Sequence, residues 1–119
     1  MTETTYPRVY VETIDGVTVA SFSDSEMVSE EVIHEVDEQL GELAGSVQSG
    51  DVLLNFREVR LMSSTMLAVL LKFSRKLAAR RGKVKLCCLD PSLQEIFKIT
   101  RFDRLFEIHD KEFVALDSF

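Results

Sequence analysis

The sequence predicts an α/β fold in which a mixed β-sheet is covered by helices, with elements in the order β-β-α-β-α-β-α-β-α. Three observations lead to this prediction. Asp15-Gly16 separates two runs of β-forming residues, which is the pattern of a two-residue hairpin. After residue 28, short apolar runs alternate with stretches of helical periodicity, as in parallel strands joined by helical crossovers. The length of 119 residues suits a single domain, 1–119, with a modest core.

The runs on either side of the turn, Val9–Ile14 and Val17–Phe22, are predicted as the first two strands. The residues before them, 1–7, are expected to form a short N-terminal lead-in. This segment has neither a basic stretch nor an apolar stretch, so we do not expect a signal peptide. The sequence therefore favours a cytoplasmic protein.

The first helix is expected to begin after Ser29, a residue type that caps helix N-termini. Glu30 and Glu31 would then occupy the first turn, where negative charge is favoured by the helix dipole. Gly45 is a suitable end for this helix. Its predicted apolar face consists of Val32, Ile33, Val36, Leu40 and Leu43.

A buried strand at 52–56 and a brief charged link lead to a cluster of hydroxyl residues, Ser63, Ser64 and Thr65. The cluster opens a long apolar-periodic helix that is expected to end at Gly82. The hydroxyl groups are thus predicted to lie at a helix N-terminus, where backbone N–H groups and the dipole favour negative charge. A serine phosphate would be tolerated there. Because Ser and Thr are also preferred N-caps, a purely structural capping role remains open at this point.

The rest of the chain adds a strand at 83–89, a third helix, a short strand at 105–108 and a terminal helix at 110–116. Asp90-Pro91 marks the start of the third helix, since Asp is a good N-cap and Pro is favoured in the first helical position. The buried stripe predicted for this helix consists of Leu93, Ile96 and Phe97.

The helix that follows the hydroxyl cluster has more apolar residues than one buried face needs. The predicted buried stripe consists of Leu67, Leu70, Leu71, Leu77 and Ala78. A second stripe of Met66, Val69 and Phe73 lies about 100° away around the helix. Either the third helix covers this second stripe or it faces a partner. We assign it as a partner-binding surface, and we expect Met66 or Val69 to be at least partly exposed.

Composition excludes several classes of function. The net charge of −6 argues against nucleic acid as a partner, because phosphate backbones are bound by basic surfaces. No apolar run approaches the roughly 18 residues that a membrane-spanning helix requires, so no membrane association is expected.

Residues suited to metal binding or catalysis are few and scattered. Cys87 and Cys88 are adjacent in a predicted strand, so alternation should direct them to opposite faces and prevent a disulfide or a shared metal. His34 and His109 have no companion ligands at metal-binding spacing. The sequence has no Gly-x-Ser-x-Gly elbow either. We therefore expect no metal, no cofactor and no enzymatic activity.

The hydroxyl cluster and its surroundings resemble a known family. Residues 61–67, Leu-Met-Ser-Ser-Thr-Met-Leu, resemble the switch segment of the STAS domain (sulfate transporter and anti-sigma factor antagonist). The resemblance extends to the strand at 82–87 and to the third helix with its ending at 91–106, and it is closest to small stand-alone STAS proteins. Two positions depart from the commonest motif: Ser63 replaces Asp and Met66 replaces Gly.

The resemblance implies a regulatory protein that resembles an anti-sigma factor antagonist. Such a protein would bind a serine-kinase anti-sigma factor of the GHKL type and be released when its serine is phosphorylated. Ser64 aligns with the phosphorylated serine, Thr65 with the second hydroxyl and Ser63 with the Asp. The two departures favour an alternative, a scaffold subunit with a degenerate motif that is not switched. A nucleotide or small-ligand sensor is a third class without a positive signal in the sequence, and a homodimer stays open.

Overall fold

The computed structural model describes residues 8–47 and 50–119, so the expected lead-in at 1–7 lies outside the described residues. The strands are β1 (Val9–Ile14), β2 (Val17–Phe22), β3 (Glu26–Met27), β4 (Val52–Asn55), β5 (Leu61–Met62), β6 (Val84–Cys87) and β7 (Glu107–His109). The helices are α1 (Glu30–Ser46), α2 (Ser64–Ala78), α3 (Pro91–Ile99), a 3-10 turn η1 (Phe102–Arg104) and α4 (Glu112–Asp117). The predicted α/β fold is confirmed.

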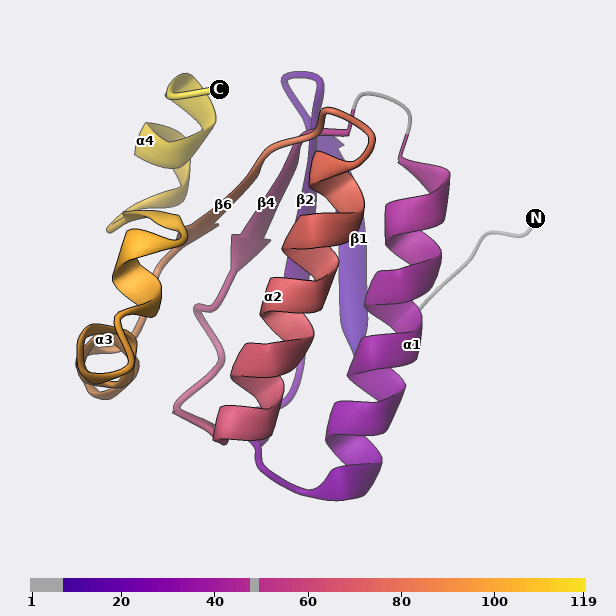
Figure 1. Cartoon of the computed structure of the whole chain (residues 1–119). Coiled ribbons are helices and arrows are strands. Elements are labelled where there is room, and N and C mark those ends of the chain that lie inside the picture. Colours follow the sequence, from indigo (N-terminus) through magenta and orange to yellow (C-terminus); the bar gives the residue numbers. More distant parts are fainter. Residues whose placement is uncertain (1–7, 48–49) are drawn as a thin grey trace.

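The main sheet has five strands in the order β1-β2-β4-β6-β7 (Figure 1). β1 is antiparallel to β2, and the other neighbouring pairs are parallel. The hairpin lies at the predicted place, and Asp15 and Gly16 both have positive φ (52° and 81°), as a type I′ turn requires. All parallel strands therefore end at the same edge of the sheet, and that edge carries the links to β3 and to α2.

A second, two-stranded sheet lies within segments that were expected to be links. Glu26 pairs with Leu61 and Met27 pairs with Met62, in parallel. Two-residue strands carry no periodic signal, so the sequence pattern missed them. Their effect is local: they join the segment that precedes α1 to the segment that precedes α2.

The larger core fills the space between one face of the main sheet and the helices α1, α2 and α3. α1 and α2 run side by side across this face (Figure 1). At the surface they are joined by Lys72 and Asp37, whose Nζ and Oδ2 lie 2.7 Å apart, and by a hydrogen bond that Arg80 donates to the Ala44 carbonyl (2.6 Å). Fully buried members of this core include Phe22, Leu40, Leu54, Leu70, Leu93 and Phe97.

A smaller core lies on the opposite face. Val19, Leu53 and Lys85 occupy paired positions on β2, β4 and β6, so their side chains share this face. α4 covers part of it and contributes Ala115, which packs in a cluster with Val17, Val19, Leu53 and Cys87. Because α4 has only six residues, it leaves the β1–β2 side of this face uncovered.

Several predicted boundaries move, among them the start of the last strand, which lies at Glu107 instead of residue 105. Two other shifts have the same physical reason, a left-handed residue. α2 ends at Ala78 instead of near Gly82, because Arg81 has φ 63° and Gly82 N donates to the Leu77 carbonyl (2.7 Å). The strand that was predicted at 83–89 is β6, and it ends at Cys87 instead of residue 89, because Cys88 has φ 65°.

The positive φ of Cys88 also makes one prediction wrong. We expected Cys87 and Cys88 to point to opposite faces, but left-handed backbone breaks the alternation of the strand. Cys88 consequently packs, partly buried, against the same small cluster as the fully buried Cys87. Both thiols are free in the structure.

Candidate functional site

Ser64 is the first residue of α2, and its side chain is exposed to solvent. Its predicted place, in the first turn of the helix after the buried strand, is confirmed. Thr65 is exposed beside it, whereas Ser63 is only partly exposed and occupies the N-cap position. Of the three hydroxyl residues, Ser64 and Thr65 are therefore accessible to an enzyme that modifies side chains.

The small β3–β5 sheet fixes the start of α2. Ser63 N donates to the Met27 carbonyl (3.1 Å), which continues the β3–β5 ladder into the N-cap. The Ser63 carbonyl in turn accepts from Met66 N (3.1 Å) in the first turn of the helix. The Ser63 Oγ makes no capping bond and is buried without a hydrogen-bond partner among the described residues. Ser63 thus positions the helix through its backbone and not through its hydroxyl.

The N-terminus of α2 is suited to an added negative charge. Its first turn contains no acidic residue, in contrast to α1, which begins with Glu30 and Glu31. Within the described part of the chain, the backbone N–H groups of Ser64 and Thr65 have no hydrogen-bond acceptor. A phosphate on Ser64 would lie at the positive end of the helix dipole and close to these donors.

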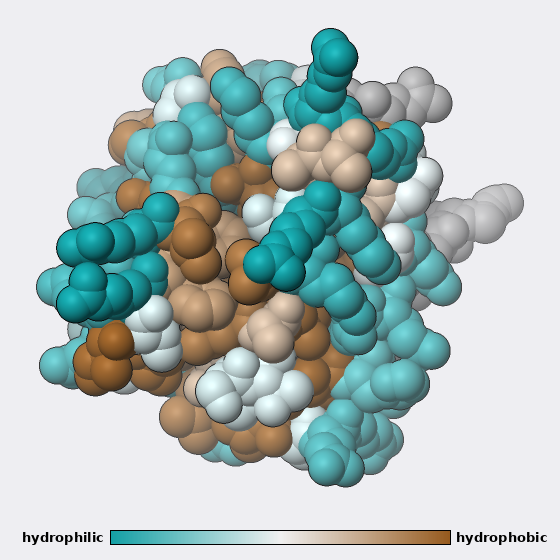
Figure 2. Space-filling model, in the orientation of Figure 1, coloured by the Kyte–Doolittle hydropathy of each residue, from teal (hydrophilic) through white to brown (hydrophobic). Residues whose placement is uncertain are grey.

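Two exposed apolar side chains lie in the segments next to the N-terminus of α2. Val28, which follows β3, is 44% exposed, and Leu61 in β5 is 46% exposed. A groove of about 300 Å³ lies between α1 and the start of α2, and its lining includes Val28, Thr65 and part of Val69. Figure 2 shows apolar surface around the N-terminal end of α2 and on its side towards α3, with hydrophilic side chains over the rest of α2 and along α1. We call Val28, Leu61, Ser64 and Thr65 the Ser64 face.

The expected exposure of the second stripe is wrong. Met66, Val69 and Phe73 are 0%, 7% and 2% exposed, and all three belong to the larger core. The reason is that α1 packs along α2, so that Val69 borders a groove shared with Ile33 of α1. The sequence suggested α3 as a possible cover of the second stripe, and it gave no indication that α1 would cover it. The second stripe is therefore part of the core, and these residues do not form an exposed partner-binding surface in this structure.

Val28 and Leu61 were not predicted to be exposed residues of the site. Each lies in a segment that was expected to be a polar or charged link, where an isolated apolar residue has no periodic partner. The only available signal was an apolar residue that no predicted helix or strand could bury.

Across residues 8–47 and 50–119, no three His, Cys, Asp or Glu side chains cluster in a way that could hold a metal ion. No helix in the same ranges has the length and apolar character needed to cross a bilayer.

The mixed sheet flanked by helices, with a hydroxyl-bearing helix N-terminus after a buried strand, is a fold that this chain shares with solved STAS domain proteins. The chain belongs to this family, since the STAS domain family model matches residues 8–115.

The family assignment is accompanied by similarity over nearly the whole chain. BtrV of Bordetella bronchiseptica, named as a candidate anti-sigma factor antagonist, is 28% identical over 116 residues, which cover 94% of each chain. An anti-sigma factor antagonist (STAS) domain protein from Planctomyces limnophilus has a similar structure (TM-score 0.83, 19% identity, 93% of this chain and 97% of that chain). The structure of Bacillus SpoIIAA in its phosphorylated form is also similar (TM-score 0.68, 16% identity, 92% and 97%).

Proposed function

We propose that this protein is an anti-sigma factor antagonist that binds a serine-kinase anti-sigma factor of the GHKL type through the Ser64 face and is released when Ser64 is phosphorylated. The observation that carries the proposal is the position of Ser64, exposed at the first residue of a helix whose first turn has no carboxylate. In this proposal the domain acts by binding and not by catalysis. It acts in the cytoplasm, where ATP is available to the kinase.

Exposure of Ser64 supports the first half of the switch, access of the kinase to the hydroxyl. The free N–H groups at the helix N-terminus support the second half, tolerance of the product. Phosphorylation adds about −1.5 to −2 charges at neutral pH. Because the N-terminus of α2 accommodates this charge, the domain stays folded while its surface changes.

The surroundings of Ser64 explain why binding would fail after phosphorylation. A partner that covers Ser64 would also cover the exposed apolar side chains of Val28 and Leu61 in the neighbouring segments. Burying a phosphate in such an interface leaves its charge unpaired and costs desolvation energy. Additional support comes from relatives: BtrV is named as a candidate antagonist, and SpoIIAA, which has the same fold, has been solved in a phosphorylated form.

The experiment is a comparison of partner affinity among variants. Wild type, Ser64→Ala and Ser64→Asp are each titrated against the kinase-type anti-sigma factor of the same genome. We expect Ser64→Ala to bind like unmodified wild type and to continue binding in the presence of ATP. Ser64→Asp should bind more weakly, because it carries part of the negative charge. Ser46→Asp is a matched control, since Ser46 is exposed at the C-terminal end of α1, away from the Ser64 face. This variant should bind the partner like wild type.

Intact mass after incubation with the kinase and ATP completes the test. One added phosphate on wild type and none on Ser64→Ala is the expected result. Equal affinities for all variants, without phosphorylation, would reject the switch. The protein would then be a constitutive scaffold subunit, the function that the replacement of Asp by Ser63 in the motif favours.

A further inference from the structure

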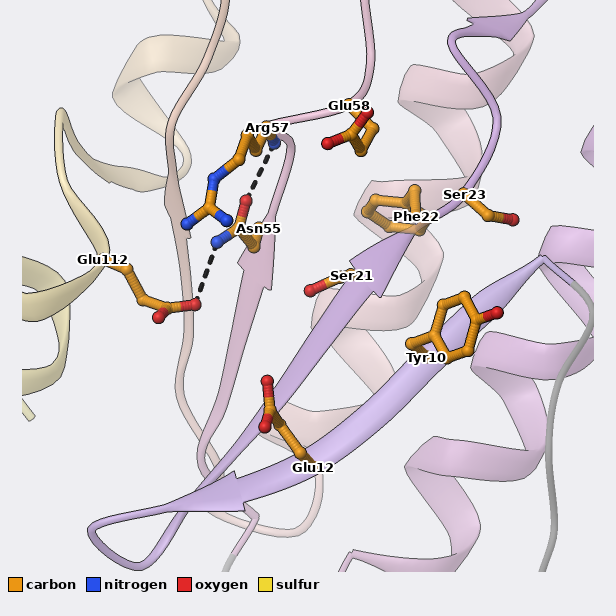
Figure 3. A pocket seen from close by; sticks show the side chains of 9 residues that line it. All are labelled: Tyr10, Glu12, Ser21, Phe22, Ser23, Asn55, Arg57, Glu58 and Glu112. Atoms are coloured by element: carbon orange, nitrogen blue, oxygen red, sulfur yellow. Dashed lines mark hydrogen bonds between the residues drawn. The ribbon is translucent and has the colours of Figure 1, made fainter.

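A second recess lies on the face of the sheet opposite α1 and α2, at the carboxyl ends of β2 and β4 (Figure 3). It has a volume of about 410 Å³, within the usual range for small-molecule sites. We call it the β-face groove. Its lining consists of Tyr10, Glu12, Ser21, Phe22, Ser23, Asn55, Arg57, Glu58 and Glu112. In open α/β sheets, ligands bind preferentially outside the carboxyl ends of the strands.

One wall of the groove is built around a buried amide. Asn55 is only 3% exposed, and both ends of its side chain are used. Its Oδ1 accepts from Arg57 N (2.8 Å), and its Nδ2 donates to Glu112 Oε2 (2.9 Å). A buried amide is tolerated only when it is hydrogen-bonded in this way. Asn55 thereby fixes both the backbone of Arg57 and the carboxylate of Glu112 before any ligand arrives.

The charged groups that face the groove are available to a ligand. Among the described residues, the Arg57 guanidinium and the Glu12 carboxylate form no ion pair or hydrogen bond. In Figure 3 the Arg57 head lies beside Asn55 and Glu112, while Glu12 points into the groove from β1. The Tyr10 ring stands on the opposite wall. The groove therefore offers a cation and a carboxylate at separate places, with an aromatic surface nearby.

This distribution selects the chemistry of the ligand. The groove contains one guanidinium and three carboxylates, so a simple anion such as phosphate would be repelled by most of its charges. A simple cation would leave Arg57 without a partner. A ligand with one carboxylate and more than one cationic nitrogen satisfies both. Arg57 can hold the carboxylate in a bidentate pair, and Tyr10 can stack with a guanidinium.

We propose that the β-face groove binds a small zwitterion of the basic amino-acid class, for which L-arginine is the test ligand. The α-carboxylate would pair with Arg57, and the cationic nitrogens would pair with Glu12 and Glu112. The proposal does not depend on phosphorylation: the groove and the Ser64 face both lie near the carboxyl edge of the sheet, but they share no residue.

The experiment is a titration of the ¹⁵N-labelled full chain with L-arginine, followed by amide chemical shifts. We expect saturable shifts at Tyr10, Ser21, Arg57 and Glu112 at millimolar ligand. Agmatine lacks the carboxylate and L-citrulline lacks the cationic side chain, so each should bind at least about tenfold more weakly.

Variants locate the site. Arg57→Gln and Glu12→Gln should each weaken L-arginine binding at least about tenfold, because a hydrogen-bonded charge is lost in each. Arg75→Gln and Glu42→Gln are matched controls on exposed helix surfaces and should bind like wild type. The spectrum of each free variant reports whether it is folded. Shifts that do not saturate, that sodium chloride reproduces, or that survive in both groove variants would overturn the proposal.

Discussion

Gly82 packs directly against Gly50: a Cβ placed on Gly82 would lie 2.6 Å from the carbonyl carbon and 2.8 Å from the Cα of Gly50. Gly50 leads into β4 and Gly82 leads into β6, and these strands are neighbours in the sheet. The obstacle is backbone on both sides, so it cannot move aside as a flexible side chain would.

Gly82→Ala should therefore destabilise the protein by about 1–3 kcal/mol, as overpacking typically does. Gly45→Ala is the matched control, because nothing lies within 4 Å of its added Cβ and the residue is exposed within α1. This change should stabilise the protein by about 0.5–1 kcal/mol through helix propensity. Urea unfolding of the two variants beside wild type measures both effects. Similar midpoints for both would show that the strand entrances separate easily.

Met66→Ala should cost about 2–5 kcal/mol of unfolding free energy, the range for removing a fully buried side chain. Ser64→Ala, two residues earlier but exposed, should stay within about 0.5 kcal/mol. Denaturant midpoints of the two variants test whether the second stripe of α2 is core. A small effect of Met66→Ala would restore that stripe as a candidate interface.

Two serine N-caps should respond differently to truncation. Ser29 Oγ accepts a hydrogen bond from Val32 N (3.2 Å), so Ser29→Ala should cost about 1 kcal/mol. Ser63→Ala should be nearly neutral, because the Ser63 Oγ makes no capping bond and is buried without a partner. Thermal unfolding of the two single variants gives the comparison. An equal loss for both would mean that Ser63 finds an acceptor or donor in solution.

The decrease in unfolding free energy at low pH should depend in part on Glu107. Its Oε2 lies 2.6 Å from His109 Nε2 and 3.1 Å from Lys85 Nζ, and these bonds hold the pKa of Glu107 below its ordinary value of 4.5. A folded-state pKa below the unfolded value stabilises the protein above about pH 4.5, and this stability is lost as the pH falls through the lowered pKa. The carboxylate is half-exposed, so the effect is screened and modest.

Glu107→Gln should flatten the decline of unfolding midpoints below pH 4.5, where wild type loses this contribution. Glu95→Gln, on the exposed side of α3, is the control and should leave the slope unchanged. Identical pH profiles for wild type and Glu107→Gln would contradict the prediction.

Local signals explain which parts of the fold were predictable. The Asp15-Gly16 turn and the N-caps Ser29 and Asp90 each depend on one or two residues whose preferences are strong, and the structure confirms all three. Periodicity also identified Leu67, Leu70 and Leu77 of α2 as buried, but Leu71 is only partly buried and Ala78 is exposed. It could not tell that α1 covers Val69, because a helical pattern gives the direction of a face but not the identity of its neighbour.

The two candidate sites also differ in whether the sequence predicts them. Ser64 was predictable because the strand, the hydroxyl cluster and the helix are consecutive in the sequence. The β-face groove was not, because Tyr10, Ser21, Asn55 and Glu112 come from four segments that only the folded sheet brings together. No short motif connects them, so their association requires the strand order and register.

The small core beneath α4 gives the chain a second level of stability. Cys87 is fully buried there, and burial raises the pKa of its thiol. The thiol should therefore resist alkylation as long as α4 lies on the sheet. The polar contacts of α4 include the bond from Asn55 Nδ2 to Glu112 Oε2 (2.9 Å) and, just after the helix, the bonds from Lys85 Nζ to the Ser118 carbonyl (2.7 Å) and to Ser118 Oγ (2.9 Å). Transient detachment of α4 would expose the thiol while the larger core stays intact. In a Cys88→Ser background, the labelling rate of Cys87 would thus report the local detachment of α4. Equilibrium unfolding of the whole domain does not detect this motion.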